Sequence, residues 1–206
     1  MDKANNNIPS REIADSLLGE AAVMNPGPWE QHSQLVAQAA ELIARQHPDL
    51  DPERAYVLGL LHDIGRRYGV RGMQHVLDGY RFLTKLGYTH AARICLTHSY
   101  PNKDLVYGAD AWDGSTEDLH FIEQYLAAAV YDDYDRLIQL CDSICLPQGY
   151  CLMEKRLVDV VLRYGVNEYT LPRWRAYLQV KHIIEERIGR SVYSLLPGVV
   201  ETTFSL

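Results

Sequence analysis

Residues 51–65 read DPERAYVLGLLHDIG, and they indicate a helix that lies at the centre of the fold. Asp51 and Pro52 form a strong helix start, because an aspartate caps free backbone N–H groups and a proline suits the first turn. Over 53–64 the side chains are apolar on nearly every side, which is typical of a fully buried helix. Gly65 is the expected C-terminal cap of this helix.

Apolar residues recur with a helical period on both sides of this stretch, and strand-like alternation is almost absent. We therefore predict an all-α protein, a compact helical bundle that forms a single domain over 1–206. A long loop is expected at 99–116, where proline, asparagine, glycine and aspartate follow no period. The predicted helices cover residues 10–20, 29–45, 53–64, 73–86, 89–98, 117–129, 131–145, 152–164 and 171–189.

The composition is that of an ordinary globular protein, with 206 residues, 47% of them hydrophobic. A formal net charge of −7 argues against a nucleic-acid polymer as partner. The N-terminal MDKANNNIPS shows no signal peptide, and no apolar run is long enough to span a membrane, so a cytoplasmic protein without a membrane partner is expected. Four buried free thiols are expected at Cys95, Cys141, Cys145 and Cys151.

A histidine and an aspartate stand at the end of the buried helix, at His62 and Asp63. Two ionisable groups in an apolar setting need partners, because burying them unpaired is costly. A metal ion supplies a partner for both, since neutral imidazole and ionised carboxylate together suit a first-row divalent ion. The pair therefore predicts a metal site.

Further candidate ligands lie near the ends of neighbouring predicted helices. His32 lies in the first turn of the helix over 29–45, His75 opens the next one after the buried helix, and His98 closes the one after that. Asp142 stands in the otherwise apolar sequence LCDSI, where a solvated surface charge is not expected.

The order of these residues resembles the H…HD…D pattern of the HD superfamily of metal-dependent phosphohydrolases, here in its HDIG form. The resemblance implies an all-α bundle whose ligands lie within 29–145 and whose core is completed by helices over 152–206. Members that hold two metals add two histidines between the HD pair and the last aspartate. The matching positions are His32, His62, Asp63, His75, His98 and Asp142.

The resemblance implies two divalent ions (iron, manganese or zinc) bridged by Asp63. One ion is then held by His32, His62 and Asp142, and the other by the two added histidines. It also implies hydrolysis of a small phosphate mono- or diester, with a nucleotide as the first candidate, by attack of a metal-bound hydroxide. Such a centre is positive and attracts phosphate even in an acidic chain.

Residues near the ligands are candidates for catalysis and substrate binding. Arg66 follows the HDIG motif and is assigned, with Asp63, to catalysis and to the substrate phosphate, the alternative being a solvated helix-end cation. Arg67 and Arg71 are weaker candidates of the same kind. Lys103 can guard the entrance or be a solvated loop residue. The aromatic residues Tyr100, Tyr107 and Trp112 can stack on a nucleobase or pack on the helical core.

Other functions remain open. A few HD proteins use the same six ligands for a mixed-valent di-iron centre that activates oxygen, so a di-iron oxygenase is the main alternative. A nucleotide-binding sensor is a third, although the complete ligand set argues against it. The last long helix has an apolar stripe that includes Trp174 and Tyr177, which fits either the core or the seam of a homodimer. Four further histidines are assigned no role, namely His47, His90, His120 and His182, and His90 is the substitute should His98 not be a ligand.

Overall fold

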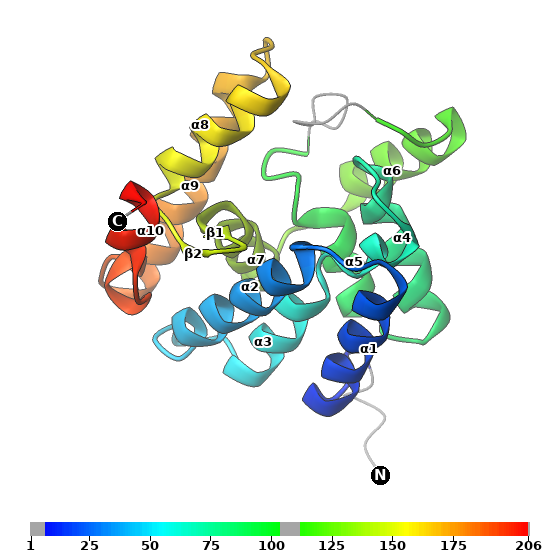
Figure 1. The fold of residues 1–206 in the computed structure, drawn as a ribbon, viewed down its shortest axis with the longest axis horizontal. Helices are drawn as coiled ribbons and strands as arrows, with labels where there is room; N and C mark the ends of the chain where they lie inside the picture. Colours follow the sequence, from blue (N-terminus) through cyan, green and yellow to red (C-terminus); the bar gives the residue numbers. More distant parts are fainter. Residues whose placement is uncertain (1–6, 104–111, 206) are drawn as a thin grey trace.

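The computed structural model describes residues 7–103 and 112–205, and nearly all of its regular structure is helical (Figure 1). The all-α prediction is confirmed, and each predicted helix is present. The helices are α1 Arg11–Met24, α2 Trp29–Ala44, α3 Pro52–Leu61, α4 Gln74–Lys85, α5 Thr89–Thr97, α6 Thr116–Ala128, α7 Asp133–Ile144, α8 Met153–Tyr164, α9 Thr170–Ile188 and α10 Val199–Phe204.

Two predictions about the end of the buried helix are wrong. The helix α3 ends at Leu61, not at Ile64, and Gly65 does not cap it. The chain instead enters a short 3-10 helix, η1, over Ile64–Tyr68. Gly65 is needed there for close packing, because a Cβ atom on it would lie 1.9 Å from the carbonyl oxygen of His75. A tertiary contact therefore sets this turn.

The structure also contains short elements that the sequence did not predict. Strands β1 Cys145–Leu146 and β2 Gly149–Tyr150 form a small antiparallel hairpin directly after α7. A second 3-10 helix, η2, covers Val192–Leu195, and α10 follows it. Each is shorter than two helical turns, which leaves too few residues for periodicity to show.

Helix starts follow their sequence signals. The side chain of Asp51 accepts a hydrogen bond from the backbone N–H of Arg54 at 2.7 Å, with Pro52 in the first turn of α3. At the start of α7, Asp132 and Asp135 form a reciprocal capping box. These capping side chains accept hydrogen bonds from backbone N–H groups that have no partner within the helix.

The core includes the packed pair α2 and α3, which lie side by side in the lower half of Figure 1. Gly59 of α3 lies against Ala37 of α2, where an added Cβ atom would come within 2.9 Å of the Ala37 Cα, so the two backbones approach closely. Residues from α7, α8 and α9, including Leu137, Leu157 and Ile184, join the same apolar cluster. This packing places the N-terminus of α2 beside the C-terminus of α3.

The four cysteines are buried and free, as predicted. Burial raises the pKa of each thiol, which keeps the thiols protonated. No helix in the described part of the chain is long and apolar enough to cross a lipid bilayer.

Candidate metal centre

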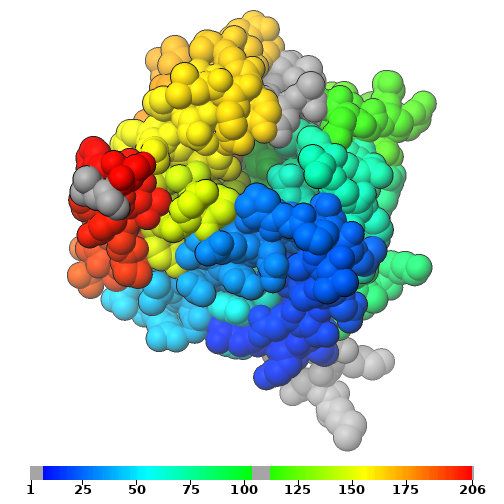
Figure 2. Space-filling view, in the orientation of Figure 1, coloured from blue at the N-terminus to red at the C-terminus, as the bar shows by residue number. Residues whose placement is uncertain are grey.

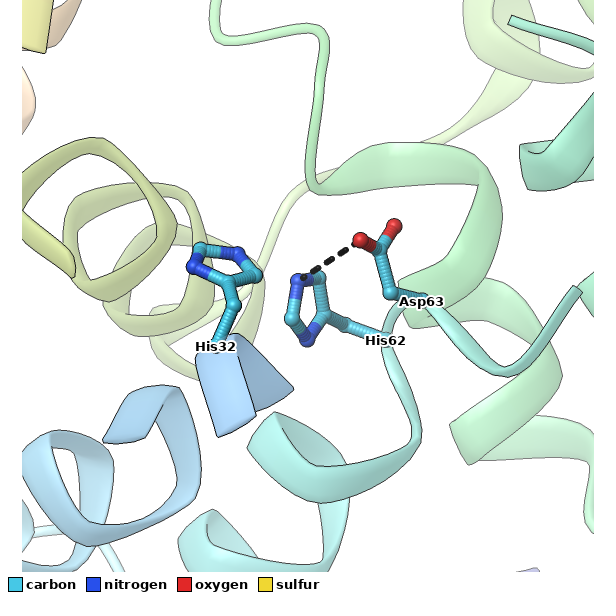
Figure 3. Close-up of side chains that lie close together, drawn as sticks. All are labelled: His32, His62 and Asp63. Carbon is cyan, nitrogen blue, oxygen red and sulfur yellow. Dashed lines mark ion pairs between the residues drawn. The ribbon is translucent and has the colours of Figure 1, made fainter. Parts of the chain in front are cut away.

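Three of the predicted ligands meet where α2 and α3 come together. His32 projects from the first turn of α2, while His62 and Asp63 follow the last residue of α3 (Figure 3). All three are buried, and each offers a ligand atom within 4.8 Å of the others. Figure 3 shows the His62 ring turned toward the Asp63 carboxylate, 3.9 Å away at its closest oxygen.

A second group of three uses the same aspartate. His75 comes from the first turn of α4, and His98 caps the C-terminus of α5. Their Nε2 atoms lie 2.9 Å and 3.6 Å from Oδ1 of Asp63. This group, too, has its ligand atoms within 4.8 Å of one another. Asp63 therefore lies between two pairs of histidines.

Asp142 of α7 completes the set on the side of His32. Its Oδ1 lies 3.0 Å from Nε2 of His32 and 3.9 Å from Nε2 of His62. Its side chain keeps 18% of its surface exposed, whereas that of His62 is fully buried. The structure thus brings all six residues predicted as ligands to one place.

Backbone carbonyls orient three of the imidazole rings. The Nδ1 atoms of His62, His75 and His98 lie 2.7, 2.5 and 3.1 Å from the carbonyl oxygens of Gly59, Gly72 and Ile94. A carbonyl only accepts hydrogen bonds, so Nδ1 carries the proton and Nε2 of the neutral ring presents its lone pair. In each case Nε2 is the atom that faces Asp63, which is how metal-binding histidines are usually held.

The protonation states suit a cation. Burial lowers the pKa of His62, and it lowers the pKa of His98 to about 3, so both rings are neutral at pH 7. Burial alone would raise the pKa of Asp63, but Arg66, His75 and His62 hold it well below its usual range. Burial likewise opposes ionisation of Asp142, whose pKa is lowered by the hydrogen bond with His32. Neutral imidazoles beside ionised carboxylates form a metal-binding donor set.

One buried atom tests whether a metal fits here. Nε2 of His62 has no hydrogen-bond partner among the described residues, although two carboxylate oxygens lie 3.9 Å away. An unpaired buried nitrogen is costly, and a cation between it and the carboxylates would satisfy all three atoms. The residues present therefore fit a divalent ion.

Arg66 lies at the edge of the centre. Its Nε donates to Oδ2 of Asp63 at 2.6 Å, and its carbonyl oxygen accepts a hydrogen bond from the Asn25 side chain at 2.7 Å. The Arg66 side chain is 29% exposed and lines the cavity described next. Its role beside the substrate phosphate stays a prediction.

The centre opens into a cavity of about 740 Å³. His32, Asp63, His75, His98 and Asp142 lie on its wall, which continues over Trp29 at the start of α2 and over the chain between η1 and α4. The opposite wall is formed by α8 and α9. In Figure 2 a hollow is visible between α8, in yellow, and the teal segment near α4.

Of the other residues predicted to bind substrate, Arg71 lines this cavity, whereas Arg67, Lys103 and Tyr100 lie elsewhere and are not part of the lining. Arg67 stacks over the ring of Phe82, 3.9 Å from its centroid. Lys103 donates a hydrogen bond to the carbonyl oxygen of Ala129 at 2.6 Å. Tyr100, only 2% exposed, packs in a second apolar cluster with residues of α4, α5 and α6.

The remaining candidates are the aromatic residues Trp112 and Tyr107 and the alternative ligand His90. Trp112 donates to the carbonyl oxygen of Ser115 at 2.9 Å, and Tyr107 lies outside the described residues. His90, the suggested substitute for His98, lies against Arg54 and Asp132 instead. These contacts give His90 a structural role.

Sequence reasoning missed the cavity wall opposite the centre. Arg156 and Arg163 of α8 and Arg173 of α9 line it, together with Trp174 and Tyr177. Both aromatic residues also pack in or against the core, as their apolar stripe predicted. Arginines are common on helix surfaces, so no sequence signal distinguished the three that face the cavity.

Comparison with known proteins gives one match. The family model of the HD domain matches residues 29–145, which is more than half of the chain. The match includes all six candidate ligands and ends one residue after α7. No curated protein and no solved structure matches the chain.

Proposed function

Because this chain belongs to the HD domain family, we propose that it is a metal-dependent phosphohydrolase acting on a small phosphate mono- or diester. The observation that carries the proposal is the pair of buried His/Asp groups that share Asp63. Two ions held side by side can serve both the attacking and the leaving oxygen of an in-line displacement at phosphorus. A carboxylate that belongs to both groups can hold two such ions side by side.

Each of the two groups would hold one ion. His32, His62 and Asp142 would bind the first, His75 and His98 the second, and Asp63 would bind both. The bound ions would act as Lewis acids toward the phosphate group and make water acidic enough to supply a nucleophile near neutral pH. The donor set accepts iron, manganese or zinc, because all three combine with imidazole and carboxylate ligands.

The residues of the chain have separate tasks in this proposal. The carbonyl of Gly59 fixes the ring of His62, and the carbonyls of Gly72 and Ile94 fix the other two rings, so that little reorganisation is needed. Arg66 reaches the cavity from beside Asp63 and would bind the phosphate oxygens, where a guanidinium can donate two parallel hydrogen bonds. It would stabilise the charge that develops during transfer.

A nucleotide is the substrate class we favour. The cavity volume of about 740 Å³ lies in the range typical of small-molecule sites, and it exceeds what a single phosphate group fills. Trp174, which is partly buried, lines it and offers a flat apolar surface on which a base can stack, and the buried Trp29 adds an apolar edge to the lining.

The test is phosphate release from a panel of phosphate esters by the chain loaded in turn with manganese, iron and zinc. We expect release from at least one nucleotide, and we expect His98→Ala to abolish it. His182→Ala is the matched control, because His182 is 63% exposed on α9 and remote from the ligands. Two irons with a mixed-valent paramagnetic resonance signal, and no phosphate release, would instead identify a di-iron oxygenase.

A further inference from the structure

The cavity extends well beyond the candidate metal centre. Its lining runs from His32 and Asp63 on one wall to Arg156, Arg173 and Trp174 on the other. The second wall belongs to α8 and α9, which follow the part of the chain that matches the HD domain. A ligand bound at the centre would therefore meet residues that the family match does not include.

The charges of the lining are unevenly distributed. The chain has 27 acidic and 20 basic side chains, but among the described residues the acidic ones that line the cavity are Asp63 and Asp142 of the centre. The basic ones are five arginines. Two of them, Arg66 and Arg71, stand on the side of the centre, while Arg156, Arg163 and Arg173 stand on the opposite wall. An excess of positive charge in a concave site of an acidic protein favours an anionic ligand.

Arg156 and Arg173 share a neighbour with the centre. Tyr177, 8% exposed, lines the same cavity as these two arginines and Asp142. Burial and the nearby Asp142 carboxylate raise the pKa of Tyr177, while Arg173 and Arg156 act in the opposite direction. All three charged groups are thus within electrostatic reach of one phenol.

The charges of Arg156 and Arg163 are partly neutralised by one shared carboxylate, that of Asp159. Asp159 lies 3.5 Å from the Arg156 guanidinium and 2.9 Å from that of Arg163, so one carboxylate serves two cations. The Asp159 side chain is itself 44% exposed, and water screens such a pair. A phosphate group can replace the Asp159 carboxylate as partner of these arginines, because two of its oxygens can accept a bidentate pair of hydrogen bonds from one guanidinium.

We propose that Arg156 and Arg173 form a second anion subsite, which selects substrates that carry at least one phosphate group in addition to the one at the metal centre. The proposal rests on the proposed function, because it assumes that the first phosphate group lies at the centre. The ligand class is an oligophosphate, such as a nucleoside di- or triphosphate, whose chain of phosphates extends from the centre toward α8 and α9. Arg163, at the rim, would assist its entry.

The test compares binding of inorganic tripolyphosphate and orthophosphate to the full chain by calorimetry. We expect wild type to bind tripolyphosphate at least about tenfold more tightly than orthophosphate, since the extra phosphates gain charge-assisted hydrogen bonds. The double variant Arg156→Gln/Arg173→Gln should lose most of this preference and keep its affinity for orthophosphate. If the double variant fails to fold, Arg173→Gln alone should show a partial loss of the same kind.

Arg175→Gln is the matched control, because Arg175 lies on the same helix, is exposed and does not line the cavity. It should bind both anions as wild type does. Equal affinity of wild type for the two anions, or a double variant that keeps the full preference, would overturn the subsite. Tripolyphosphate binding that depends on these arginines in a chain that releases no phosphate would instead contradict the proposed function and leave the subsite standing.

Discussion

Nε2 of His32 and Oδ1 of Asp142 lie 3.0 Å apart, although 110 positions separate the two residues in the chain. The contact joins the first turn of α2 to α7, and it closes the centre on the side opposite His75. The candidate ligands come from helices that pack on one another, so the geometry of the centre depends on the fold as a whole. Substitutions that shift these helices should therefore affect metal binding as well as stability.

His75→Ala should remove one of two bound ions and leave the other. His75 belongs to only one of the two groups of candidate ligands, so the group that contains His32 stays complete. The number of ions per chain, measured by elemental analysis after loading and desalting, should fall from about two to about one. One ion per chain in wild type, unchanged by the substitution, would show that the centre holds a single metal.

Arg66→Gln should lower kcat by about a hundredfold while the metal content stays the same, because a lost hydrogen-bond donor to developing charge acts in the transition state. Arg66→Lys should recover only part of the rate, since an ammonium group cannot donate the bidentate pair. Arg45→Gln is the control, because Arg45 is a surface arginine that directly follows α2 and pairs with Glu41. Loss of metal together with activity in Arg66→Gln would mean that Arg66 supports the ligands rather than the phosphate.

Gly65→Ala should destabilise the chain by at least about 3 kcal/mol, because the new Cβ atom would lie 1.9 Å from the His75 carbonyl oxygen and the backbone would have to move. Gly19→Ala is the matched comparison, and it should have the opposite effect on stability. Gly19 is exposed on α1 with nothing within 4 Å of the added atom, so this change should stabilise by about 0.5–1 kcal/mol. Urea denaturation measures both, and a Gly65→Ala variant as stable as wild type would contradict the close packing of η1 on α4.

Asp132→Ala should destabilise the chain by about 1 kcal/mol at pH 7, because Asp132 caps α7, the helix that carries Asp142. Burial opposes ionisation, but contacts with His90 and with the backbone N–H of Asp135 lower the pKa of Asp132 to about 2. A pKa lower in the folded than in the unfolded state stabilises the fold above about pH 4, and this contribution is lost as the pH falls toward 2.

The difference in unfolding free energy between wild type and Asp132→Ala should therefore narrow between pH 4 and pH 2. Asp132→Asn offers a useful comparison, because it keeps a side-chain oxygen for the cap but cannot ionise. A difference between wild type and Asp132→Ala that stays constant over this range would show that the charge of Asp132 does not contribute.

Much of the centre was predictable because polar residues stand in apolar surroundings. Buried ionisable groups are rare without partners, so the apolar neighbours of His62, Asp63 and Asp142 pointed to a shared site. The C-terminal end of α3 was not predictable, because a tertiary contact, and not a local sequence signal, ends the α-helical conformation before Asp63. Gly65 has to pack against the backbone of α4, and no local pattern in the sequence specifies that contact.

The substrate-facing residues were harder to predict. Tyr100 and Lys103 follow His98 closely in the sequence, but the chain turns so that one packs in an apolar cluster and the other binds a backbone carbonyl. Arg156 and Arg173 are far from the ligands in the sequence and reach the cavity only because α8 and α9 lie across from the centre. Sequence distance is a poor guide to which residues share a cavity.

The most direct test of a shared aspartate is the metal content and phosphate release of Asp63→Ala beside those of wild type. Asp118→Ala is the control, because Asp118 is a carboxylate of α6 paired with Arg81 outside the cavity. The shared position of Asp63 predicts about two ions per chain in wild type and in the control, with phosphate release lost on chelation and restored by metal. It predicts that Asp63→Ala loses both ions and the activity together. An Asp63→Ala variant that keeps its metal and still releases phosphate would contradict the account.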